Sequence, residues 1–207
     1  MENKQFTEIL GETPSNDYQY PGTYLDCDKS GSLVVYTKNL GTSSEFYIPD
    51  ADLKTELDTS GCVKIQPNAS DDLSSSKIFI GDYSDTNNTG IVYVYSSDGT
   101  GITNFATGLG ENSYSGYSID ITNDGEKVAV AERDKISVWK QADDGNYNIV
   151  GDYFNNQLDR GTDSEGSSQY PKIITKETIL SSSPLNNISI SLDGNKVLTN
   201  LYQTKNT

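Results

Sequence analysis

Carboxylates are the main candidates for acid–base chemistry in this 207-residue chain, because the sequence contains no histidine. The absence of imidazole excludes a Ser-His triad, an imidazole general base and a metal held by histidine. The sequence also contains no P-loop, no dinucleotide-binding fingerprint and no Gly-x-Ser-x-Gly motif. Two carboxylates alone can hydrolyse a glycosidic bond, so a glycoside hydrolase is the enzymatic alternative to our expectation that the chain is not an enzyme.

The elements that must position these side chains form an internal repeat. Residues 118–130 are the clearest unit, and residues 187–199 repeat them nearly position for position. Residues 23–36 and 63–80 are more divergent copies. Each copy has an apolar alternation, a turn and a second apolar run, and three of the turns are of the Asp-Gly or Ser-Gly type. This pattern predicts a β-hairpin in every copy.

A third strand follows in three of the copies, and a weaker fourth strand follows it. Residues 5–10 look like a further fourth strand. Four strands in a period of roughly 40–50 residues are typical of propeller blades. We therefore predict an all-β, β-propeller-like array of about four four-stranded antiparallel blades, with the last blade incomplete. The single domain spans residues 1–207, with repeats near 23–57, 62–107, 117–150 and 187–207 and an insertion at 151–186.

The stretch "GYSIDITNDGEKVAVAE" followed by "KISVWK" resembles the FG-GAP-like repeats of integrin-alpha-type β-propellers, in the divergent form of bacterial and large-virus proteins. Residues 149–152 and 9–12 look like the strand-end region of that family. The resemblance is specific at residues 116–140 and 187–197. The Gly-His and Trp-Asp marks of WD40 blades are missing.

The resemblance implies calcium in the loop between the first and second strands of a blade. Oxygen ligands at alternate positions before a glycine suit such a hard cation. The candidate ligands are Asp26, Asp28 and Ser30 in one copy, and Asp120 and Asp124 in another. Both loops lack the later carboxylate of a calcium loop, and Asp and Ser also favour turns without any metal. We therefore expect no cofactor, with weak calcium binding as the alternative.

The last repeat stops after its second strand, which predicts an open sheet edge along residues 196–201. An open edge invites a strand from another chain. Either a partner covers this edge or the polypeptide continues past Thr207, unless the strand-like residues 172–175 of the insertion pair with it. The predicted partner-binding residues are Lys196, Val197, Leu198 and Leu201 on this strand, with Tyr170 and Ile173 from the insertion.

The net charge and the composition limit the classes of partner that this chain could bind. A net charge of −15 argues against nucleic acid and anionic membrane surfaces. The sequence shows no apolar signal region and no apolar run of membrane-spanning length, so we expect an intracellular or virion location. Cys27 and Cys62 are too few for a disulfide framework and are expected to be reduced, half-buried thiols.

These observations favour a non-catalytic β-propeller that acts as an interaction or structural module and binds other proteins. The family resemblance places such a module in a virion or another large assembly. The alternatives are a cell-surface adhesion or glycan-binding propeller and a propeller glycoside hydrolase.

Overall fold

The computed structural model describes residues 21–29, 31–38, 44–48, 53–57, 61–66, 75–83, 85, 89–106, 113–132, 135–154, 172–175 and 187–200. The elements with defined bounds in these ranges are all β-strands. A helix of the length and hydrophobicity needed to span a membrane is not found within the same ranges.

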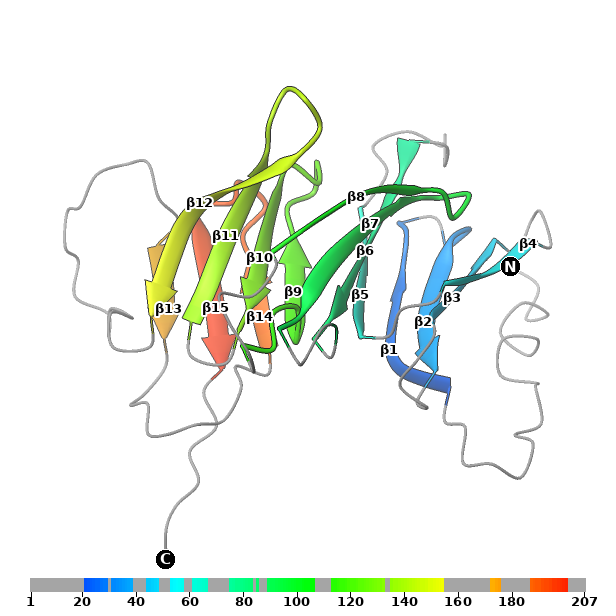
Figure 1. The fold of residues 1–207 in the computed structure, drawn as a ribbon, viewed down its shortest axis with the longest axis horizontal. Coiled ribbons are helices and arrows are strands. Elements are labelled where there is room, and N and C mark those ends of the chain that lie inside the picture. Colours follow the sequence, from blue (N-terminus) through cyan, green and yellow to red (C-terminus); the bar gives the residue numbers. More distant parts are fainter. Residues whose placement is uncertain are drawn as a thin grey trace, which may run out of the picture.

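The strands form four sheets that stand side by side in chain order (Figure 1). The first sheet contains β1 (Pro21–Cys27), β2 (Val34–Lys38), β3 (Ser44–Ile48) and β4 (Leu53–Leu57). The second contains β5 (Cys62–Ile65), β6 (Lys77–Asp82), β7 (Ile91–Ser96) and β8 (Gly101–Phe105). The third contains β9 (Ser118–Ile121), β10 (Lys127–Ala131), β11 (Lys135–Gln141) and β12 (Tyr147–Phe154).

Consecutive strands pair antiparallel in each of these three sheets, so the predicted four-stranded antiparallel sheets are confirmed. The hairpin turns of the clearest copies also agree. Gly31, Gly125 and Gly194 all have a positive φ, between 66° and 75°. Each donates its N–H to the carbonyl oxygen three residues earlier. Glycine adopts this left-handed conformation without the cost that a Cβ atom imposes, which explains the turn signal of the sequence.

The core consists of three apolar layers, one between each pair of neighbouring sheets. On β6, Ile78 and Ile80 pack toward the first sheet while Phe79 packs toward the third. On β10, Val128 and Val130 pack toward the second sheet and their neighbours toward the fourth. Successive side chains of a strand point to opposite faces, so a continuous apolar run supplies two layers at once.

The fourth sheet corrects one prediction. It contains β14 (Asn187–Ile190), β15 (Lys196–Asn200) and β13 (Lys172–Thr175), in the order β13-β15-β14. β15 pairs antiparallel with β14 on one side and parallel with β13 on the other. The predicted open edge is therefore wrong for residues 196–199, where the inserted segment pairs with β15 from within the same chain.

The described residues predicted to bind a partner at that edge lie within the fourth sheet, paired or packed against other parts of the chain, or are exposed. Val197 is fully buried between the third and fourth sheets, whereas Leu198 is 55% exposed. Lys196 pairs with Lys172, and Ile173 pairs with Val197, in the β13–β15 ladder. Tyr170, Leu201 and the predicted N-terminal strand at residues 5–10 lie outside the described residues.

Candidate functional site

The first strand of each repeat lies at the inner edge of its sheet. β1 contacts β5, β5 contacts β9 and β9 contacts β14, so the four inner strands form a row across the molecule (Figure 1). Each of these strands pairs with only one neighbour within its own sheet. Alternate backbone N–H groups of an edge strand point away from the sheet and need acceptors from elsewhere.

Two aspartates at equivalent positions supply such acceptors. The Oδ2 atom of Asp26 on β1 accepts the backbone N–H of Ile65 on β5, with 2.8 Å between oxygen and nitrogen. The Oδ2 atom of Asp120 on β9 accepts the backbone N–H of Ile190 on β14 at the same distance. Hydrogen bonds to an ionised acceptor are stronger than neutral ones, so each carboxylate fastens its own inner strand to the next.

The junction between β5 and β9 is different, because Lys64 occupies the equivalent position on β5. A lysine side chain has no acceptor and cannot receive a backbone N–H. Its Nζ atom lies 3.4 Å from Oδ1 of Asp120, and the two side chains are 37% and 16% exposed. An ion pair therefore closes this junction in place of a carboxylate–amide hydrogen bond.

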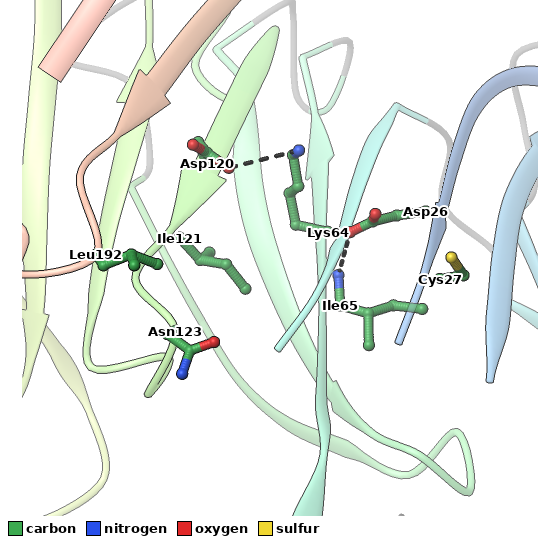
Figure 2. A pocket seen from close by; sticks show the side chains of 8 residues that line it. All are labelled: Asp26, Cys27, Lys64, Ile65, Asp120, Ile121, Asn123 and Leu192. Carbon is green, nitrogen blue, oxygen red and sulfur yellow. Dashed lines mark hydrogen bonds and ion pairs between the residues drawn. The ribbon is translucent and has the colours of Figure 1, made fainter. Parts of the chain in front are cut away.

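A cavity of about 190 Å³ opens at this junction (Figure 2). Figure 2 shows Lys64 between the two carboxylates, with its ammonium group directed toward Asp120. Leucine at position 192 is 78% exposed and adds an apolar surface from the turn after β14. The cavity is lined by Asp26, Cys27, Lys64, Ile65, Asp120, Ile121, Asn123 and Leu192. It is smaller than the roughly 300–1,000 Å³ of sites for drug-sized ligands, so it fits a single side chain or a small group.

Asp26 is the carboxylate of the cavity that has no ion-pair partner among the described residues. Burial raises its pKa above the ordinary value, and the negative charge of Asp120 adds to this effect. The backbone N–H of Ile65 and the ammonium group of Lys64 lower the pKa but do not outweigh burial. The ionised form of Asp26 is therefore only partly compensated in this structure.

The aspartates named as candidate calcium ligands make hydrogen bonds within the chain. Asp28 is buried, and its Oδ1 atom accepts the backbone N–H of Leu33 at 2.7 Å, whereas Asp26 is directed toward the second sheet. Asp124 accepts the hydroxyl of Thr122 and the backbone N–H of Glu126 within its own turn. Ser30 lies outside the described residues.

Within the described ranges, no group of three or more His, Cys, Asp or Glu side chains is placed to hold a metal ion. The alternation of Asp and Ser thus has a structural explanation in turns and strand junctions. The expectation of no cofactor, with weak calcium binding as the alternative, stays a prediction.

The two cysteines are free, and their environments differ. Cys27 is exposed and lines the cavity, while Cys62 is buried and its thiol donates to the carbonyl oxygen of Gly116 at 3.2 Å. Burial raises the pKa of Cys62 to about 12. Burial also raises the pKa of Cys27, and the neighbouring Asp26 and Asp28 add to that shift. Neither thiol is half-buried in the way that the sequence suggested.

Sequence reasoning selected Asp26 and Asp120 but missed Lys64, Asn123 and Leu192. A usable signal existed: Asp26, Lys64 and Asp120 each lie between two apolar residues of the first strand in their repeat. Aligning the repeats on their first strands would have placed the three charges in one row.

Comparisons with known proteins agree with the fold. No family model matches this chain, and no curated protein matches it. The chain is similar to a structure titled "Complex of KlAtg21 with coiled-coil of AgAtg16", with a TM-score of 0.52 and 12% identity over 82% of this chain and 46% of that one. A functionally unknown protein from Desulfotomaculum acetoxidans DSM 771 gives a TM-score of 0.47, with 15% identity over 82% of this chain and 45% of that one.

Hsv2 from Kluyvelomyces marxianus gives a TM-score of 0.36, with 9% identity over 81% of this chain and 53% of that one. The chain thus spans about half the length of the solved chains that it matches. At such identities the likeness to the KlAtg21 structure shows the fold alone. Together with the four sheets in a row, it identifies an all-β, β-propeller-like array.

Proposed function

We propose that this chain is a non-catalytic interaction module of the β-propeller type, and that a segment of a partner protein docks in the inner-strand cavity. One observation carries the proposal: a cavity lies along the inner strands, lined by Asp26, Lys64 and Asp120 and by the exposed Leu192. Small cavities with apolar walls and a few placed polar groups are suited to specific recognition.

The printed title of one similar structure supports a protein partner, since that propeller is in complex with a coiled coil. From this likeness we propose only that the partner of the present chain is also a protein. The finer role, as a component of a virion or another large assembly, rests on the resemblance to FG-GAP-like repeats and is part of the proposal.

A glycoside hydrolase is the second candidate, because Asp26 and Asp120 line the same cavity. The raised pKa of Asp26 is what a general acid of such an enzyme needs. Against this, Lys64 lies between the two carboxylates (Figure 2). Both oxygens of Asp120 are also engaged, one by Ile190 and one by Lys64. This arrangement favours binding over hydrolysis.

The test uses the exposed thiol of Cys27 to block the cavity. A peptide library is selected on the purified chain, and the selected peptides are measured again after Cys27 has been alkylated with a bulky maleimide. The Cys27→Ser variant, treated in the same way, is the matched control. We expect alkylation to weaken binding at least tenfold in the wild type and to leave the variant unchanged.

Two results would overturn the proposal. One is that no peptide is selected, or that the selected peptides bind equally well after alkylation. The other is that nitrophenyl glycosides are hydrolysed, or glycans on an array are bound, in a manner that alkylation of Cys27 abolishes. The latter result would move the function to the enzyme or the glycan-binding class.

A further inference from the structure

We propose that the inner-strand cavity accepts a lysine or arginine side chain of the partner segment, with the cationic end at Asp26 and the aliphatic stem along Ile121 and Leu192. The identity of the partner segment rests on the proposed function. The preference for a cation rests on the chemistry of the cavity.

Among the described residues that line the cavity, the carboxylates outnumber the cations by one. Asp26 and Asp120 contribute two negative charges, and Lys64 contributes one positive charge. The ammonium group of Lys64 pairs with Asp120, which leaves Asp26 without an ion pair among the described residues. The net charge of −15 over the whole chain further attracts a cationic segment and repels an anionic one.

The environment of Asp26 favours a cation for a second reason. Burial disfavours its ionised form, and a cation that lies close to it within the same cavity stabilises that form. An anionic ligand would instead be repelled by the two carboxylates. The ammonium group of Lys64, which could bind an anion, is already paired with Asp120.

The remaining walls suit the stem of a long basic side chain. Ile121 on β9 is partly buried and Leu192 is largely exposed, whereas Ile65 is buried in the layer between the first and second sheets. Lysine and arginine bury their methylene groups along apolar surface while the charged end reaches a polar partner. Asn123 lines the same cavity and provides an amide oxygen that can also accept from the cation.

The test is a titration of the full chain followed by NMR, with Nα-acetyl-lysine N-methylamide as the probe. The matched control ligand is Nα-acetyl-norleucine N-methylamide, whose side chain has the same four carbons but lacks the ammonium group. The reporter is the backbone amide of Ile65, because its N–H is bonded to Asp26. We expect a saturable shift of this amide with the lysine probe and none with the norleucine probe.

Two variants complete the design. Asp26→Asn keeps an oxygen acceptor for Ile65 but removes the charge, and we expect it to weaken binding of the lysine probe at least tenfold. Asp143→Asn removes the same charge from an exposed position in the turn between β11 and β12, and it should bind like the wild type. Equal shifts with both probes, or equal binding by Asp26→Asn and the wild type, would overturn the inference.

The two experiments distinguish failure of the cation preference from failure of the proposed docking function. If alkylation of Cys27 blocks the selected peptides but these contain no basic residue and tolerate Asp26→Asn, docking in the cavity stands and the cation preference is wrong. If no selected peptide is blocked while the lysine probe still shifts Ile65, the cation preference stands and the docking function is wrong.

Discussion

The carboxylate of Asp120 on β9 accepts the backbone N–H of Ile190 on β14, with 2.8 Å between oxygen and nitrogen. A side chain of the third sheet thereby caps the inner edge of the fourth sheet. Asp26 makes the same bond to Ile65 between the first and second sheets. In a chain with only 33% hydrophobic residues, such junctions supplement the three apolar layers that join the sheets.

Asp120→Ala should destabilise the fold. The substitution leaves the N–H of Ile190 without its acceptor and Lys64 without its carboxylate, which costs about 1–3 kcal/mol. Urea unfolding measures the change, and hydrogen exchange at the amide of Ile190 should accelerate. Asp143→Ala is the matched control and should change the free energy of unfolding by less than about 0.5 kcal/mol. Equal stability of the two variants would contradict the role that we assign to Asp120.

A buried ion pair at the β10–β11 hairpin gives a second prediction. Nζ of Lys135 lies 3.6 Å from Oε1 of Glu132, and both side chains are only 4% exposed. The hydroxyl of Ser137 donates to the same carboxylate oxygen at 3.0 Å and accepts from the indole N–H of Trp139 at 2.9 Å. Lys135→Met removes this cation from beside the buried carboxylate of Glu132 and should lower the free energy of unfolding by about 3–5 kcal/mol.

The control for the ion pair is Lys140→Met, which alters an exposed lysine of the same strand and should have little effect. The double variant Glu132→Gln with Lys135→Met should recover part of the lost stability, since no uncompensated charge is left. Thermal or urea unfolding of the four proteins checks both expectations. A double variant less stable than Lys135→Met would show that the charge is not the cause.

The two thiols should react at very different rates. Cys27 is exposed, but its raised pKa leaves less thiolate at neutral pH, so it should react with a disulfide reagent more slowly than free cysteine. Cys62 is buried with a pKa raised to about 12, so it should react only after unfolding. Titration with DTNB should therefore count one thiol in the native protein and two in urea. The Cys27→Ser variant should show none in the native state, and a rapidly reacting second thiol would contradict the structure.

Acid should weaken the turn at Asp193. The hydroxyl of Ser191 and the backbone N–H of Asn195 both donate to this carboxylate and lower its pKa below 3.8. A folded-state pKa below the unfolded value adds stability above about pH 3.8, and this stability is lost as the pH falls through the folded-state pKa. Wild type should therefore be more stable than Asp193→Asn at pH 7, and the difference should shrink toward pH 2. A difference that is constant over this range would contradict the shift.

The repeat pattern was sufficient to predict the hairpins. The Asp-Gly turn at Asp124 and Gly125, with apolar alternation on both sides, appears in the structure as the β9–β10 pair. Turn chemistry and alternation act locally, so the sequence records them directly. The same holds for the antiparallel order of the first three sheets, in which neighbours in sequence are neighbours in space.

The pairing of β13 with β15 could not be predicted with the same certainty. Ile173 and Ile174 form a short apolar run inside a polar insertion, and such a run identifies a strand but not its partner. A parallel partner is reached through a crossover, so neither a tight turn nor a fixed spacing marks it. The hydrogen bond of Asp26 could not be predicted for a related reason. Its partner, the N–H of Ile65, lies 39 positions away, whereas calcium was considered only within the local loop.

The most direct test of the account is a crystal structure of the chain with a peptide selected in the Cys27-blocking experiment. We predict that the peptide lies across the inner strands, with a lysine or arginine side chain in the cavity beside Asp26 and its stem against Leu192. A peptide bound elsewhere, for example along the outer edge of β13, with the cavity unchanged, would contradict the central claim that the inner-strand cavity is the interaction site.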